Sequence, residues 1–231
     1  MKKVAILVDG GFFKKRAQTI YGHLSPEELA DKMLKQCRDH VSHKSKDASK
    51  NELYRIFYYD CPPLDKKVKH PLTGEMIDFS KKESTIESLE FLNILREKRK
   101  VALRLGKLTG SGSDYVLPSY NVKKLCSGSL TIDNLKPGDL RLEVRQKGVD
   151  MRIGLDIASL AYKKQVDQIV LIAGDSDFVP AAKLARREGI DFILDPMWNQ
   201  ISPDLMEHID GLFTYAAKPK ALLKKENSNN K

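Results

Sequence analysis

Cysteine is scarce in this sequence, and its scarcity excludes one class of fold at the outset. The three cysteines, Cys37, Cys61 and Cys126, are odd in number and far apart in the chain. Neither a framework of disulfide bonds nor a zinc site built from paired cysteines fits that spacing. We therefore expect reduced thiols, which are typical of cytoplasmic proteins.

Long apolar runs are also missing. No stretch approaches the ~18 to 20 consecutive apolar residues that a transmembrane helix needs, so we expect no membrane association. The start of the chain, Met1–Lys3 followed by Val4–Val8, imitates a signal peptide, but its apolar part ends at Asp9. That part is too short for the apolar region of a signal peptide. We expect a cytoplasmic protein.

Two nucleotide-binding motifs are absent as well, since the chain has no Gly-x-Gly-x-x-Gly and no Walker lysine motif. Positive charge, in contrast, is abundant: 40 Lys and Arg residues against 31 Asp and Glu residues leave a formal net charge of +9. Such an excess favours an anionic polymer as partner, because neutralising phosphates releases condensed counterions. A basic surface without that function is the plainer alternative.

Apolar β-branched segments alternate with helical segments along the chain. Continuous apolar strands are typical of a parallel sheet that is covered on both faces, and the alternation predicts a doubly wound α/β fold. Strands are predicted at residues 4–8, 53–59, 101–105, 168–173 and 190–194, with an edge strand at 212–215. Helices are predicted from residue 11, and at 26–40, 84–100, 150–164, 178–188 and 203–208.

We expect one domain over residues 1–216, followed by a disordered basic and polar tail over 217–231. Residues 106–140 interrupt the α/β rhythm with glycine, serine and lysine, and short apolar alternations at Tyr115–Leu117 and Leu130–Ile132 predict a small hairpin. Leu140–Val144 is predicted as its returning strand. An insertion of this length in a compact domain is usually functional or mobile. We interpret it as a flap on the substrate side.

Aspartates follow two of the predicted strands directly. Val4–Val8 runs into Asp9, and Ile169–Ala173 leads through one glycine to Asp175 and Asp177. Because ligands of open α/β sheets bind outside the carboxyl ends of the strands, we expect these carboxylates to gather at one edge. Crowded carboxylates raise one another's pKa unless a cation shares them. The pattern therefore predicts a divalent metal site.

Two further aspartates lie in the helix predicted after Gly148. At ~100° per residue, Asp150 falls between Ile157 and Ala161, on the arc that faces the sheet. Its alternative role is that of a helix N-cap. Asp156 borders the same arc, so it fits either a metal ligand or a surface ion pair of little energetic consequence.

The turn after the strand predicted at 168–173 offers similar alternatives. Asp177 is placed to cap the helix that begins near Phe178, whereas Asp175 lies within the turn without a capping duty. For Asp9 the plainer role is an Asp-Gly turn. Hard oxygen ligands without His or Cys favour Mg²⁺ or Mn²⁺. A pair of such ions about 4 Å apart can activate water and stabilise both oxygens of a phosphodiester displacement.

Four segments carry a resemblance to a known family. They are Val4–Gly11, Tyr58-Tyr59-Asp60, Lys147–Asp150 with Asp156, and Gly174–Pro180, and together they resemble an NYN domain of the PIN-like nuclease superfamily, in its bacterial stand-alone branch. The likeness spans residues 2–215. It implies an α/β fold of the PIN-like Rossmannoid type, a three-layer sandwich with a mostly parallel sheet, to which the flap insertion is added.

The resemblance also implies a function, namely metal-dependent cleavage of RNA. Asp9, Asp150, Asp175 and Asp177 match the acidic pocket of the family, and many relatives carry Asn where this chain has Gly11. An RNA-binding regulator with little or no turnover is therefore the alternative function. An aspartyl-phosphate phosphatase is disfavoured, because it needs a second carboxylate at the position of Gly11.

Basic residues near the motifs are the predicted nucleic-acid contacts. They are Lys14 and Lys15 after the first motif, and Arg145 and Lys147 beside the third. We expect single-stranded RNA as the partner. The apolar residues of the helix over 29–37 fit a homodimer face as well as a core face, so the oligomeric state stays open.

Overall fold

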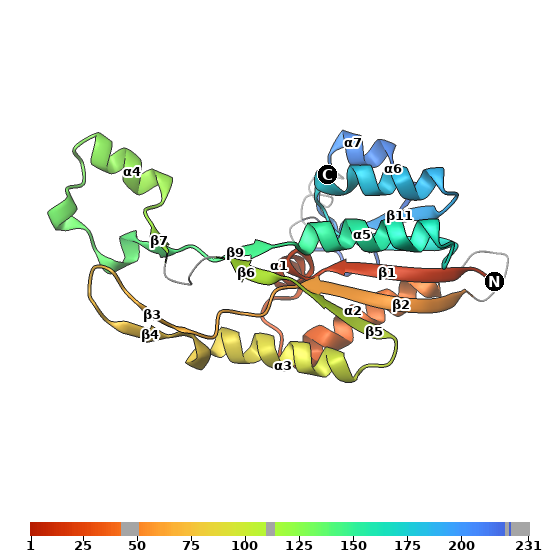
Figure 1. Cartoon of the computed structure of the whole chain (residues 1–231), viewed down its shortest axis with the longest axis horizontal. Helices are drawn as coiled ribbons and strands as arrows, with labels where there is room; N and C mark the ends of the chain where they lie inside the picture. Colours follow the sequence, from red (N-terminus) through yellow and green to blue (C-terminus); the bar gives the residue numbers. More distant parts are fainter. Residues whose placement is uncertain (43–50, 110–113, 220–221, 223–231) are drawn as a thin grey trace, which may run out of the picture. The chain divides into compact units, whose positions relative to one another are not determined.

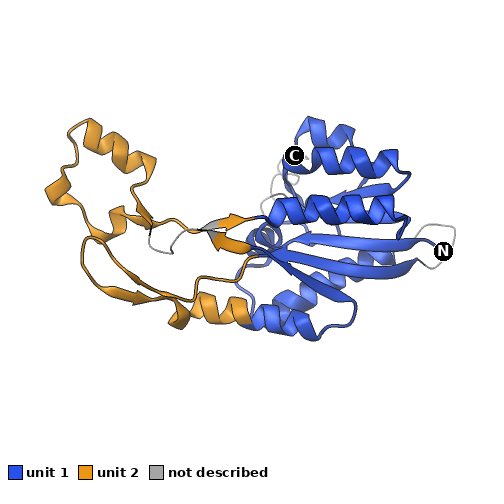
Figure 2. Cartoon of the chain, in the orientation of Figure 1, with its two compact units in different colours: residues 1–60, 90–106, 148–231 blue, residues 61–89, 107–147 orange. Residues whose placement is uncertain are grey.

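The computed structural model describes residues 1–42, 51–109, 114–219 and 222, which fall into two compact units. Unit 1 consists of Met1–Asp60, Glu90–Gly106 and Gly148–Lys231, and unit 2 consists of Cys61–Leu89 and Lys107–Lys147 (Figure 2). The insertion predicted at 106–140 overlaps the second segment of unit 2. Most of the tail predicted at 217–231 lies outside the described residues.

Unit 1 is built on a six-stranded sheet in which all neighbouring strands run parallel (Figure 1). In chain order the strands are β1 (Lys3–Asp9), β2 (Glu52–Asp60), β5 (Val101–Leu105), β10 (Gln168–Ile172), β11 (Asp191–Asp195) and β12 (Gly211–Leu212). Their order in space is β12-β11-β10-β1-β2-β5. The chain order thus reverses between β1 and β10, which is the topological switch point of a doubly wound sheet.

Helices cover both faces of this sheet. On one face lie α1 (Gly10–Tyr21), α2 (Pro26–Val41) and α3 (Glu83–Glu97), which share one apolar core with the strands. The opposite face is covered by α5 (Val149–Tyr162) and α6 (Val179–Arg187) (Figure 1). The short helix α7 (Pro203–Glu207) follows β11. The predicted three-layer α/β sandwich with a parallel sheet is confirmed.

Between its ends, strand β1 is apolar on both faces, and the burial of its residues explains this pattern. Val4, Ile6 and Val8 belong to the core formed with α1, α2 and α3. Ala5 and Leu7 point to the other face and are fully buried there as well. Because helices cover both faces, every side chain between the ends of the strand is removed from water.

The helix predicted over 26–40 contributes its apolar face to the same core. Ala30, Met33 and Cys37 are buried there, and Leu29 and Leu34 pack against them while partly exposed. The described part of the chain contains no helix long and apolar enough to cross a lipid bilayer.

The described residues of unit 2 form three two-stranded antiparallel ribbons, one complete helix and the first part of α3 (Figure 2). The ribbons pair β3 (Lys67–Lys69) with β4 (Met76–Asp78), β6 (Lys107–Thr109) with β9 (Arg145–Lys147), and β7 (Tyr115–Val116) with β8 (Arg141–Leu142). The complete helix is α4 (Ser119–Cys126), and the short 3-10 turns are η1 (Phe79–Lys81), η2 (Ile132–Asn134) and η3 (Pro137–Asp139).

One prediction for this region is wrong. The segment Leu130–Ile132 forms no strand with Tyr115–Val116, because α4 follows directly and Ile132 begins η2. The partner strand is Arg141–Leu142, which lies within the returning strand predicted at Leu140–Val144. The alternation of apolar residues was too short to distinguish a strand from a 3-10 turn.

Candidate active site at the carboxyl edge of the sheet

Asp9 is the last residue of β1 and also the N-cap of α1. Its Oδ1 atom accepts a hydrogen bond of 3.1 Å from the backbone N–H of Phe12. The next residue, Gly10, has no room for a side chain, since a Cβ atom there would lie 2.7 Å from the carbonyl oxygen of Tyr59 and would overlap the ring of Tyr58. The tight junction between strand and helix therefore fixes the direction of the Asp9 carboxylate.

The environment of Asp9 is unfavourable for a negative charge. Burial, and to a smaller extent the charges of Asp150 and Asp60, raise the pKa of its carboxyl to about 6, although the hydrogen bond from the Phe12 N–H opposes this. At neutral pH the carboxyl is therefore ionised at a cost, which a bound cation would relieve.

Asp60 is a neighbour of this site that the sequence analysis did not select. It ends β2, one residue beyond the Asp9–Tyr59 pair, and is only 1% exposed. The Tyr58 hydroxyl donates to Asp60 Oδ2 at 2.9 Å, and Lys14 Nζ lies 2.7 Å from the same atom. The signal was present, because Asp60 follows an apolar strand just as Asp9 does. Lys14, predicted to bind RNA, is thus held in an ion pair with a buried carboxylate.

Asp175 and Asp177 follow β10, on the other side of the switch point, in a turn that contains η4 (Ser176–Phe178). Asp175 caps this turn, because its Oδ1 atom accepts the N–H of Asp177 at 3.1 Å. The N-cap of α6 is Phe178, without a side-chain hydrogen bond. The predicted capping roles are therefore reversed: Asp175 has the structural duty and Asp177 has none. Both residues are exposed.

Asp150 lies in the first turn of α5, on the same arc of the helix as the buried residues Ile157 and Ala161. It is exposed, because α5 begins where β1 ends (Figure 1) and the inward arc of its first turn opens to solvent. It does not cap the helix either, since the N-cap is Gly148 with a φ of 82°. Partial burial, then the charges of Asp175 and Asp177, raise the pKa of the Asp150 carboxyl. The Asp150 carboxylate therefore repels Asp9 on one side and Asp175 and Asp177, in the turn after β10, on the other.

Asp156 lies six residues further along α5, about 9 Å away along the helix axis. Its Oδ2 atom accepts a hydrogen bond of 2.8 Å from the Tyr59 hydroxyl and one of 3.0 Å from Arg104 Nε. These contacts are those of the ion pair that the sequence analysis considered as the alternative for Asp156. No contact among the described residues supports a metal-binding role for Asp156 in the same way.

The four aspartates do not form a closed cage. Among the described residues, the group whose metal-binding atoms lie within 4.8 Å of one another is Asp204, Glu207 and His208, at the exposed end of α7. The four aspartates are spaced more widely and consist of carboxylate oxygens alone. This arrangement suits a cation that keeps several of its waters and uses few protein ligands, as Mg²⁺ does.

The other predicted RNA contacts are distributed over both units. Lys15 is exposed on α1 in unit 1. Arg145 and Lys147 belong to β9 in unit 2, where Lys147 is exposed and pairs with Lys107 across the ribbon.

The comparisons with known proteins give one family match. The family model of the NYN domain matches residues 128–215. This range contains Asp150, Asp156, Asp175 and Asp177 but not Asp9. No curated protein matches the sequence.

Among solved structures, a protein of unknown function from Vibrio parahaemolyticus is 16% identical, with a TM-score of 0.49 and 93% of each chain covered. A structure of Sir2Tm bound to a propionylated peptide is 13% identical, with a TM-score of 0.32, and covers 99% of this chain and 94% of its own. The family model is the informative match: the model of the NYN domain matches residues 128–215, which confirms the resemblance read from the third and fourth segments.

Proposed function

We propose that this protein is a metal-dependent ribonuclease that hydrolyses phosphodiester bonds of single-stranded RNA. The observation that carries the proposal is the coupling of four aspartates at the switch point of the sheet. Asp9 follows β1, Asp175 and Asp177 follow β10, and Asp150 interacts electrostatically with all three. The NYN domain indicates a nuclease-like fold, which supports the same conclusion.

The donor set is suited to Mg²⁺ or Mn²⁺. The candidate ligands are Asp9, Asp150, Asp175 and Asp177, and all of their donors are hard carboxylate oxygens. When bound, such a cation supplies charge stabilisation at the phosphate and lowers the pKa of a nearby water. Its charge would also relieve the repulsion among the four carboxylates.

The exposure of each residue indicates which part of the RNA-binding site it could form. Asp150, Asp175 and Asp177 are open to solvent, so the backbone of a polymer can reach them. Asp9 is only partly exposed, and its carboxylate is held by the hydrogen bond from the Phe12 N–H. Exposed Lys15 and Lys147, together with Arg145 on β9, are the proposed contacts to RNA phosphates.

The proposal is tested by incubating the purified protein with single-stranded RNA and Mn²⁺. The informative variant is Asp177→Asn, since the Asp177 side chain makes no cap and its loss should leave folding intact. Asp31→Asn is the matched control, because Asp31 is an exposed aspartate on α2. We expect cleavage by the wild type and the control, and loss of at least about 100-fold in Asp177→Asn, as for other groups that position charge in a transition state.

Equal cleavage by Asp177→Asn would refute the assignment of the site. RNA retention that weakens with salt, without cleavage in any divalent cation, would instead support the alternative function of an RNA-binding regulator. Gly11 motivates that alternative, because it offers only its backbone where many relatives of the NYN type have an Asn side chain.

A further inference from the structure

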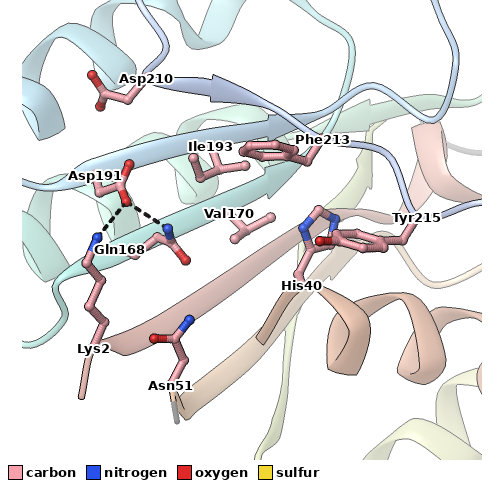
Figure 3. Close-up of a pocket in the computed structure, with 10 residues that line it drawn as sticks. All are labelled: Lys2, His40, Asn51, Gln168, Val170, Asp191, Ile193, Asp210, Phe213 and Tyr215. Carbon is pink, nitrogen blue, oxygen red and sulfur yellow. Dashed lines mark hydrogen bonds and ion pairs between the residues drawn. The ribbon is translucent and has the colours of Figure 1, made fainter. Parts of the chain in front are cut away.

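A cavity lies in unit 1, on the face of the sheet that α2 covers in part (Figure 3). Its volume is about 300 Å³. Lys2, Gln168 and Asp191 line its polar end, at the amino ends of β1, β10 and β11. Since β1 spans seven residues, this end lies roughly 20 Å from Asp9 along the strand. The cavity is therefore separate from the acidic site at the carboxyl edge.

Strand register explains how the cavity is built. Gln168 pairs with Asp191, and Val170 pairs with Ile193. Because side chains alternate along a strand, these four residues share one face, with the polar pair at the rim and the apolar pair as the floor. Figure 3 shows the four side chains around the same space.

Aromatic rings form the opposite wall. Phe213 is 40% exposed, and its ring lies over Gly211, where a Cβ atom would come within 2.8 Å of both Phe213 Cε2 and Ile193 Cδ1. Beside it, the rings of His40 and Tyr215 meet edge to face with centroids 4.6 Å apart. The glycine at 211 thus makes room for an exposed aromatic ring that faces the cavity.

The polar rim presents hydrogen-bonding groups that the described residues leave unused. The amide of Asn51 has no hydrogen-bond partner in the described part of the chain. Asp191 receives both of its bonds on Oδ2, from Lys2 Nζ at 3.1 Å and from Gln168 Nε2 at 2.8 Å. The Oδ1 atom of Asp191 and the Oε1 atom of Gln168 accept no bond from a described residue. The rim therefore offers both a donor and acceptors.

We propose that this cavity binds a nucleobase. A base has a flat apolar face that fits against aromatic rings, and its edge carries both donors and acceptors that suit a mixed rim. The volume, about 300 Å³, lies at the lower end of the range for small-molecule sites, which favours a single nucleoside unit over a longer segment. The base comes either from a free nucleotide or from an unpaired residue of an RNA strand.

The test is calorimetric titration of the full chain with AMP, GMP, CMP and UMP, in EDTA so that the acidic site holds no cation. We expect at least one nucleotide to bind, and Phe213→Ala and Asn51→Ala each to weaken its binding about tenfold, the usual effect of losing one ring contact or hydrogen bond. Leu212→Ala is the matched control, because Leu212 is next to Phe213 and similarly exposed but is not among the residues that line the cavity. It should bind as the wild type does.

A further variant separates this site from the proposed active site. Asp175→Asn should bind the nucleotide normally, whether or not the protein cleaves RNA. The proposal is overturned if no nucleotide binds at millimolar concentration, or if Asp175→Asn abolishes binding while both cavity variants retain it. A short RNA oligonucleotide that displaces the nucleotide from the wild type would identify a strand as the source of the base, and failure to displace it would identify the free nucleotide.

Discussion

The replacement Asp9→Asn should stabilise the folded protein at neutral pH while removing its response to divalent cations. The pKa of the Asp9 carboxyl rises from 3.8 to about 6 on folding. Below pH 4 the carboxyl is protonated in both the folded and the unfolded state, so it adds no pH-dependent term. Above pH 6 it is ionised in both states, and the ionised form is disfavoured in the folded protein. Ionisation therefore costs at most about 3 kcal/mol, and the cost develops between pH 4 and pH 6.

Asparagine removes this cost without removing the local structure. Its side-chain oxygen can still accept the Phe12 N–H, and Asn is a favoured N-cap. In EDTA at pH 7.5 we expect Asp9→Asn to raise the free energy of unfolding by about 1 to 3 kcal/mol, and at pH 4 we expect the two proteins to converge. Urea denaturation at several pH values measures both quantities.

Addition of Mn²⁺ completes the test. The cation should stabilise the wild type, because it binds only the folded site, and should stabilise Asp9→Asn much less. If Asp9→Asn were no more stable than the wild type at pH 7.5 in EDTA, the electrostatic description of the site would be wrong. The Asp31→Asn variant is the control for a general loss of negative charge.

Three further predictions concern the surroundings of the site. Asp195 is fully buried and accepts hydrogen bonds from Gln36, His40 and the Met197 N–H. Asp195→Ala should therefore lower the free energy of unfolding, measured by urea denaturation, by about 3 to 5 kcal/mol. A loss below about 1 kcal/mol would contradict this. Gly10→Ala forces a Cβ atom against β2, so we expect destabilisation of at least ~1 to 3 kcal/mol together with loss of Mn²⁺-dependent stabilisation in thermal melts. Gly11→Asn should leave the melting temperature nearly unchanged. If the lack of a side chain at position 11 limits turnover, this variant should cleave RNA faster than the wild type in a time course.

Much of the architecture of unit 1 could be predicted from local patterns. Apolar runs such as Val4–Val8 mark strands that are covered on both faces, because water is excluded from every side chain between their ends. An aspartate at the end of such a run indicates the carboxyl edge of the sheet, since the chain must turn there. Asp9 and Asp175 were found in this way.

Other features depend on contacts between distant segments and could not be predicted. The exposure of Asp150 depends on where α5 begins relative to the sheet, and the pairing of Asp156 with Arg104 joins α5 to β5. Unit 2 combines two segments that are separated by 17 residues of unit 1, Glu90–Gly106. No local pattern carries that information.

The sequence by itself determined the strands, most of the helices and the aspartates that end the strands, because hydrophobic periodicity and turn chemistry act over a few neighbouring residues. Only the tertiary structure decided which charges meet. It paired Lys14 with the buried Asp60 and Asp156 with Arg104, and it opened a cavity between β10, β11 and Phe213. Pairing and burial of this kind arise from the order of strands in the sheet, which brings together residues far apart in the chain.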